Sequence, residues 1–323
     1  MAKETPFFYA RSLCLPPTPE VRSDQPVLVR HRSGIIPSIE TQHQTWDAMA
    51  PLTVLDHLIN PLASAAQLVK FTSSDVVDGA SIRFAQAQLT QAAGVLLRLP
   101  QAVIATAIVL LQRYTVGIDV DQRDQFSPQT ISAASIYLSA KMSFTPLSPR
   151  SVINVYVYLT SPASPLKFVN PAGAATDPDP KTYFVSEGTY ERERQRLFSC
   201  ESAILAGIGF DTHVALPHSL ALTYLQALGV ASPTLSRRVF EHLNGGLLSP
   251  QFLYLTHQPN ALAVAAIYLA ARELEIKLVD ENWWDVFDVD REDLGFLVLA
   301  YGSLTNFAEA EATKWEGKSL SLG

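Results

Sequence analysis

The stretch Ala134-Ser-Ile-Tyr-Leu-Ser-Ala-Lys141 recurs later in the chain as Ala265-Ala-Ile-Tyr-Leu-Ala-Ala-Arg272. Each copy has the composition of a helix and carries small residues on most of its faces, so that neighbouring helices can approach it from every side. A helix with this property suits the centre of a bundle. Because the two copies lie far apart in the chain, they indicate a duplicated helical domain.

Helical patterns surround both copies. Apolar residues recur at three- and four-residue spacing, and Pro100, Pro128 and Pro149 stand where the first turn of a helix tolerates proline. These signals predict helices over residues 80–99, 101–116, 129–142, 150–159, 189–208, 216–228, 234–243, 259–275, 281–287 and 291–307. Strand patterns are few. The prediction is an all-α protein with two tandem five-helix bundles, each built around an Ala-rich third helix.

The segments between and beside these helices set the expected domain boundaries. Residues 1–60 carry scattered prolines and no sustained period, which predicts an irregular N-terminal extension. The first bundle is expected over residues 61–211, with a proline-rich insertion at 161–187. The second bundle is expected over 212–308, and residues 309–323 are expected to form a tail.

The composition excludes several classes of protein. Charged residues make up only 17% of the 323 residues, whereas hydrophobic residues make up 48%; about 25% charged is typical. With a net charge of −7, the chain lacks the broad basic surface of a general nucleic-acid binder.

The sequence also bears on the compartment. The most apolar run, 102–111, is about half the length of a membrane span, and residues 1–10 have no apolar core of a secretory signal. Two cysteines, Cys14 and Cys200, allow at most one disulfide. We expect a soluble protein of a reducing, intracellular compartment, with no membrane or direct nucleic-acid partner.

Catalytic and metal-binding motifs do not stand out. The glycine pair Gly245-Gly246 lacks the spaced glycines and basic residue of a phosphate-binding loop, and it predicts a turn between helices. His213 and His218 have no cysteine or third histidine nearby to complete a metal site. The aromatic residues 283–287 lie among acidic residues that would repel phosphates, so core packing is favoured over base stacking. We expect a protein that is not an enzyme and has no cofactor or metal.

Two five-helix halves with Ala-rich third helices resemble the cyclin fold, and four stretches narrow the resemblance to L-type cyclins. These stretches are Gln91-Ala-Ala-Gly-Val-Leu-Leu-Arg-Leu-Pro100-Gln101, Val152-Ile-Asn-Val155, Leu216-Pro-His-Ser-Leu220 and Ala266-Ile-Tyr-Leu-Ala-Ala-Arg272. The resemblance covers about residues 62–308, and the short Q-type cyclins are its nearest competitor. It implies a regulatory subunit that forms a heterodimer with a cyclin-dependent kinase and activates it, in RNA polymerase II transcription or pre-mRNA splicing.

The resemblance also implies a kinase-binding pair. Lys141 ends an otherwise apolar helix and matches the family's kinase-contacting lysine, and Glu201 matches the glutamate that works with it. Taken alone, the lysine is better explained as a cation at the carbonyl end of its own helix. The glutamate is likewise explained as a solvated residue on an amphipathic helix. The match to both members of the pair favours the interface.

Four apolar residues match the family's contacts to the mobile helix of the kinase: Leu138, Met142, Leu205 and Phe210. The default explanation for apolar residues at helical spacing is the protein's own core. If they bind a kinase, at least half of them should be partly exposed in the free subunit. A fully buried set would count against the interface.

Arg83 matches the arginine of the family's first-helix motif and is expected to have a structural role. The rest of the motif departs from the family, because Ile82-Arg-Phe-Ala-Gln86 replaces the usual Met-Arg-Ala-Ile-Leu. The apolar substrate-docking patch of cell-cycle cyclins is therefore not expected. Those cyclins pair the arginine with an aspartate, whereas the matching position here is Gln112, so Arg83 needs another partner.

Two other functions fit parts of the pattern. A general transcription factor of the TFIIB type also duplicates the cyclin fold, but it should carry a zinc ribbon and a basic second repeat. A degenerate cyclin that acts as a scaffold without activating a kinase fits the altered first-helix motif. The resemblance implies a nuclear protein, with a cytoplasmic fraction left open. Residues 314–323 carry no Arg/Ser run, so direct coupling to splicing is not expected.

Overall fold

Serine and proline residues begin many of the helices in the computed structural model, which describes residues 56–73, 78–118, 125–171, 183–279, 282–320 and 322. The side chains of Ser127, Ser148 and Ser232 each accept a hydrogen bond from a backbone N–H in the first turn of the following helix, and a proline follows each serine. This arrangement satisfies N–H groups that the helix itself leaves without acceptors. Most of the expected extension 1–60 and the middle of the expected insertion, 172–182, lie outside the described residues.

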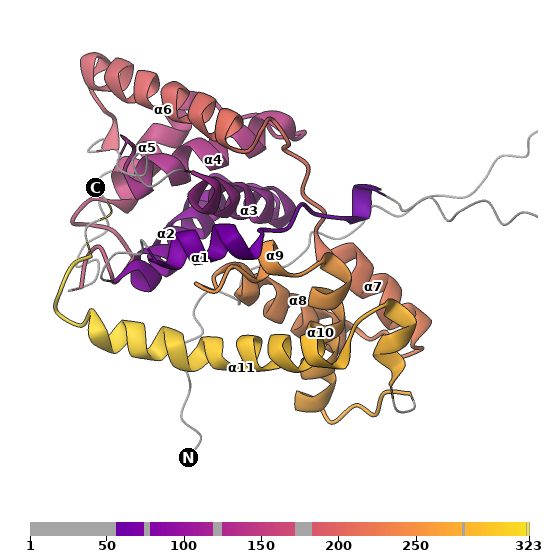
Figure 1. Ribbon diagram of the computed structural model, residues 1–323. Helices are drawn as coiled ribbons and strands as arrows, with labels where there is room; N and C mark the ends of the chain where they lie inside the picture. The colour runs from indigo at the N-terminus through magenta and orange to yellow at the C-terminus, as the bar shows by residue number, and fades with distance from the viewer. Residues whose placement is uncertain are drawn as a thin grey trace, which may run out of the picture. The chain divides into compact units, whose positions relative to one another are not determined.

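The described residues of the first half form six α-helices (Figure 1). They are α1 (Ala65–Ser73), α2 (Gly79–Leu96), α3 (Gln101–Gly117), α4 (Pro128–Met142), α5 (Pro149–Leu159) and α6 (Glu187–Gly207). The Ala-rich helix α4 contacts α2, α3, α5 and α6, as its small residues allow. Helix α1 follows the short 3₁₀ helix η1 (Asp56–Leu58) and was not predicted from the sequence.

The second half is arranged around the second Ala-rich helix. Its helices are α7 (Pro217–Ala227), α8 (Pro233–Leu247), α9 (Leu253–Thr256), α10 (Pro259–Glu273), the 3₁₀ helix η4 (Trp283–Phe287) and α11 (Arg291–Lys314). Helix α10 contacts α7, α8, α11 and η4. The described residues contain no strand, and the all-α prediction is confirmed.

The prediction of a turn at Gly245-Gly246 was wrong, because both glycines lie inside α8. A Cβ atom at Gly246 would collide with the ring of Tyr301 in α11, and one at Gly245 would lie 3.3 Å from Leu304. The glycines therefore let α8 and α11 approach closely. Of the helix predicted over residues 281–287, residues 283–287 form the 3₁₀ helix η4, and residue 281 lies outside the described residues.

The two halves share a core and a C-terminal helix. One hydrophobic cluster includes Ile104 and Ile108 of α3 together with Leu243 and Leu247 of α8. Helix α11 continues beyond residue 308, where the tail was expected to begin, and contacts the first half. Phe307 packs edge to face against Phe84, with ring centroids 5.3 Å apart. Further along, the N–H of Leu320 donates to the carbonyl of Phe168 at 2.8 Å.

Buried polar contacts add to this connection. Asn60 Nδ2 donates to the carbonyl of Ala215 at 2.8 Å, while its Oδ1 accepts from the Ala215 N–H at 2.8 Å and from Arg113 at 3.1 Å. The backbone of Asn60 exchanges two further hydrogen bonds with the side chain of Gln258. Asn60 is only 2% exposed. It therefore links the start of the first half, the connection between the halves and the start of α10.

Candidate functional site

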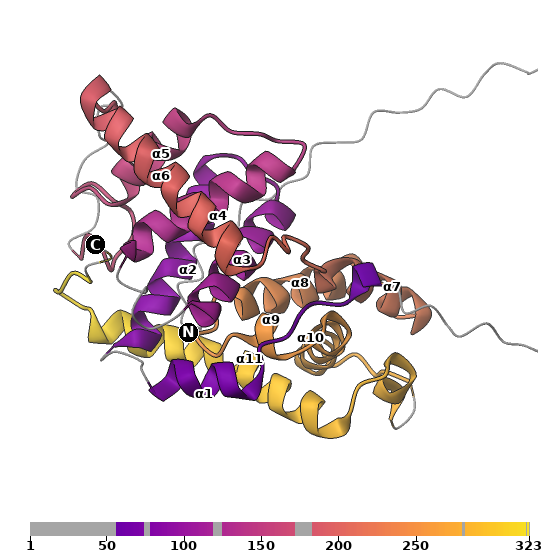
Figure 2. The same ribbon diagram turned by 45° about the horizontal axis from the view of Figure 1, so that its top comes forward.

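Helices α4 and α6 lie side by side (Figure 2). Their packing brings the two residues of the predicted pair together. Lys141 lies in the last turn of α4 and Glu201 in the second half of α6. The Nζ of Lys141 donates a hydrogen bond to Oε1 of Glu201 at 3.0 Å. Their side chains differ in exposure, at 59% for Lys141 and 9% for Glu201. The glutamate is thus almost enclosed, and the lysine presents the charge of the pair to solvent.

The pair is arranged so that the lysine keeps hydrogen-bonding capacity for another molecule. Hydrogen bonding to Glu201 raises the pKa of Lys141, so the ammonium group stays charged at neutral pH. An ammonium group has three N–H donors, and the hydrogen bond to Glu201 uses one of them. Because Lys141 is mostly exposed, its other N–H groups can reach acceptors such as the backbone carbonyls of a partner. Glu201 sets the direction in which they point.

Aromatic residues extend the site along both helices. The ring of Tyr137 lies 5.6 Å from Lys141 Nζ, and its centroid is 5.9 Å from that of Phe198. The guanidinium of Arg194 lies 5.8 Å from the Phe198 ring. These three residues were not predicted from the sequence. Helical spacing was the available signal, because Tyr137 precedes Lys141 by one turn, and Arg194, Phe198 and Glu201 fall on one face of α6.

The four predicted apolar contacts divide by exposure. Phe210 is 72% exposed and Met142 is 45% exposed, and Leu205 is partly buried. Leu138 is only 3% exposed and packs in the core of the first half. Three of the four are therefore accessible in the free chain, and Leu138 contributes to packing. Phe144, two residues after the end of α4, is fully exposed and was not predicted from the sequence.

Phe210 has an unusual backbone conformation. Its φ is 61°, and Gly209 before it has a φ of 63°, so two consecutive residues are left-handed at the end of α6. Glycine adopts this conformation readily, whereas a bulky side chain does so at a cost of about 1–2 kcal/mol. The N–H of Phe210 donates to the carbonyl of Leu205 at 2.8 Å and holds the turn. The result is a strained residue with a large apolar side chain in solvent.

The residues described so far make up one candidate surface. We define the α4/α6 surface as Tyr137, Lys141, Met142, Phe144, Arg194, Phe198, Glu201, Leu205 and Phe210.

Arg83 contacts other segments of its own chain. Its Nε donates to the carbonyl of Pro250 at 3.2 Å, and its guanidinium carbon lies 5.3 Å from the ring centroids of both Phe71 and Phe252. Gln112 instead donates through Nε2 to the carbonyl of Leu247 at 3.0 Å. Arg83 therefore joins α1 and α2 to the loop that precedes α9.

Other residues singled out in the sequence have packing roles. Trp283 is buried, and Phe287 stacks on Tyr224 with centroids 4.0 Å apart. Cys200 is buried with a free thiol whose pKa is raised to about 12 by burial.

His213 and His218 do not form part of a metal-binding group: among the described residues, no three His, Cys, Asp or Glu side chains gather in a suitable arrangement. Within the same part of the chain, no helix is long and apolar enough to cross a membrane.

Comparisons with known proteins identify the family. The chain is 31% identical over 258 residues to a protein of Schizosaccharomyces pombe described as an uncharacterized cyclin-L1-like protein, covering 80% of this chain and 93% of that one. It is 30% identical over 239 residues to human cyclin-L2, of which it spans 42%. No family model matches.

A solved structure shows the same fold. The crystal structure of the yeast RNA Pol II CTD kinase CTDK-1 complex contains a chain that matches with a TM-score of 0.61 at 14% identity, over 82% of this chain and 79% of that one. The duplicated Ala-rich helices and the four matching stretches thus agree with overall similarity along most of the chain. The chain belongs to the cyclin family, within its L-type group.

Proposed function

We propose that this protein is the regulatory subunit of a cyclin-dependent kinase that acts in RNA polymerase II transcription, and that it has no catalytic activity of its own. Its two cyclin boxes are proposed to cover residues 61–211 and 212–308. The observation that carries the proposal is the Lys141–Glu201 pair on a surface with exposed apolar residues, in a chain of the L-type cyclin group.

The α4/α6 surface is proposed to contact the mobile helix of the kinase. Lys141 donates to backbone carbonyls of the kinase, while Glu201 holds the ammonium group in place. Met142, Leu205 and Phe210 then bury their exposed area against the kinase, at about 25 cal/mol per Å² of apolar surface removed from water. A strained, exposed Phe210 gains this stabilisation only in a complex. The kinase gains an ordered active-site geometry from the contact.

The site of action is proposed to be the nucleus. The curated relatives are L-type cyclins, and the matched solved structure is of an RNA Pol II CTD kinase complex. The proposed substrate is therefore the polymerase tail. The TFIIB-type alternative has no support from these relatives.

The first experiment is affinity purification of the tagged chain from nuclear extract, followed by mass spectrometry and a kinase assay on a polymerase tail peptide. We expect a cyclin-dependent kinase and kinase activity in the eluate. The double variant Lys141→Ala/Glu201→Ala should reduce recovery of the kinase at least tenfold. The matched control is Arg150→Ala/Glu187→Ala, which removes an exposed ion pair between α5 and α6 and should leave recovery unchanged.

Two outcomes would change the proposal. Equal recovery of the kinase with both double variants would overturn the role of the α4/α6 surface. Recovery of the kinase with no activity on any peptide would favour the scaffold over the activating subunit. Circular dichroism of the purified variants is the check that each remains helical.

A further inference from the structure

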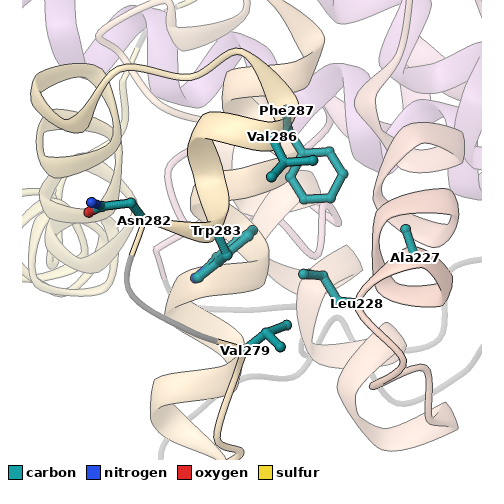
Figure 3. A pocket seen from close by; sticks show the side chains of 7 residues that line it. All are labelled: Ala227, Leu228, Val279, Asn282, Trp283, Val286 and Phe287. Carbon is teal, nitrogen blue, oxygen red and sulfur yellow. The ribbon is translucent and has the colours of Figure 1, made fainter.

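An apolar pocket opens in the second half of the chain, away from the residues that carry the proposed function. It has a volume of about 370 Å³ and lies between the end of α7 and η4. Figure 3 shows Leu228, at the end of α7, facing Trp283 and Phe287 of η4, while Asn282 points away. The apolar lining residues are Ala227, Leu228, Val279, Trp283, Val286 and Phe287.

The walls of this pocket are held in place by contacts behind them. The Phe287 ring stacks on Tyr224, and it also contacts Trp283 edge to face with centroids 6.0 Å apart. Asn260 Nδ2 donates to the carbonyls of Phe287 at 3.1 Å and Asp288 at 3.0 Å, which fixes the end of η4. The pocket is therefore formed before any ligand arrives, so binding needs little reorganisation.

The mouth of the pocket is apolar and exposed. Val286 is 82% exposed and Val279 is 55% exposed. A single exposed valine is ordinary on a protein surface. Two of them beside a preformed pocket provide apolar area that an inserted side chain would cover, in the manner of an anchor residue at a protein interface.

The stretch of sequence that contains η4 has charges of one dominant sign. Residues 275–293 contain eight Asp or Glu and two Lys or Arg, so this segment accounts for −6 of the net charge of −7. Asp285, Asp288 and Asp290, on η4 and directly after it, are exposed. A negative field of this kind attracts cations and repels phosphate groups. It therefore disfavours nucleic acid and anionic lipid as occupants and favours a basic polypeptide.

We propose that this pocket binds a short basic segment of a partner protein, which inserts one apolar side chain between Leu228 and Trp283 and pairs its flanking Lys or Arg residues with the acidic side chains around η4. The site would give the subunit a means of recruiting a basic substrate or regulator. The pocket shares no residue with the α4/α6 surface, so a failure of this proposal would leave the proposed kinase binding unaffected.

The test uses the full chain and three fluorescein-labelled peptides, with binding followed by fluorescence anisotropy. The probe is Arg-Lys-Leu-Arg-Lys. A second peptide replaces the leucine by alanine and keeps the charge, and a third replaces every basic residue by glutamate and keeps the leucine. We expect saturable binding of the probe, binding about five- to tenfold weaker for the alanine peptide, and none for the acidic peptide.

Matched variants separate the pocket from the general charge of the protein. Asp285→Lys should weaken probe binding about tenfold, whereas Glu309→Lys reverses an exposed charge elsewhere and should change it less than twofold. Val286→Ala should weaken binding about three- to fivefold, and Val69→Ala, at another exposed valine, should leave it unchanged. Equal affinity for the leucine and alanine peptides, or equal effects of Asp285→Lys and Glu309→Lys, would overturn the proposal.

Discussion

Gly246 in α8 lies directly against the ring of Tyr301 in α11, so closely that a Cβ atom at this position would collide with the ring. Tyr301 is 4% exposed and cannot turn out into solvent without emptying its site in the core. The contact between the two helices therefore depends on the absence of a side chain at Gly246.

The first prediction compares two glycines. Gly246→Ala should lower the free energy of unfolding by about 1–3 kcal/mol, because an extra methyl group overpacks a filled core. Gly295→Ala, on α11 with nothing within 4 Å of an added Cβ, should raise it by about 0.5–1 kcal/mol through helix propensity. Urea denaturation measures both. A destabilised Gly295→Ala together with an unaffected Gly246→Ala would contradict this account of the helix contact.

The second prediction concerns pH. Asn244 Oδ1 accepts from Gln101, so His218 Nε2, at 3.0 Å from the same oxygen, must carry the imidazole proton. Its Nδ1 is buried with no hydrogen-bond partner, and burial lowers the pKa of His218 below its ordinary value of 6.5. The unfolded chain therefore takes up a proton at a higher pH than the folded chain does. The contribution of His218 to the free energy of unfolding should therefore be fully present above about pH 6.5 and decline as the pH falls below this value.

The measurement is the midpoint of thermal unfolding at a series of pH values from about 7.5 down to about 5. His218→Gln should reduce the decline, and a part should remain because burial also lowers the pKa values of His242 and His257. An identical decline in the variant and the unmodified chain would show that His218 does not contribute.

The third prediction separates function from folding at Phe210. Phe210→Gly relieves the left-handed backbone strain, so the free energy of unfolding should stay the same or rise by up to about 1 kcal/mol. Kinase recovery should fall, because an exposed apolar contact is lost. Opposite effects on stability and on binding are characteristic of a residue kept for a partner. A variant that is less stable and still binds the kinase normally would assign Phe210 to the fold.

Local patterns in the sequence were sufficient for the helical architecture, for physical reasons. Small residues on most faces of 134–141 and 265–272 suit a helix to the centre of a bundle, and Pro128 and Pro149 mark the starts of two helices. The glycine pair misled the prediction because its role depends on a ring from α11, far along the chain. No local pattern reports such a contact.

The candidate site was predictable only in part. Lys141 and Glu201 were found through the family resemblance, and in the structure Lys141 Nζ lies 3.0 Å from Glu201 Oε1. Phe144 and Phe198 were missed because an exposed aromatic residue has the same sequence pattern as a buried one. The packing of α6 against α4 decides which of these side chains remain in solvent, and this depends on the tertiary structure.

The position of α11 also bears on how a ribosome produces this protein. Phe307, Lys314 and Leu322 contact residues of the first half that are translated much earlier: Phe84 packs against Phe307, Ser81 accepts from Lys314, and the N–H of Gln129 donates to the carbonyl of Leu322. During synthesis, the surface of the first half is therefore incomplete until residues 307–322 have been made. Nascent chains should expose apolar surface until that segment leaves the exit tunnel.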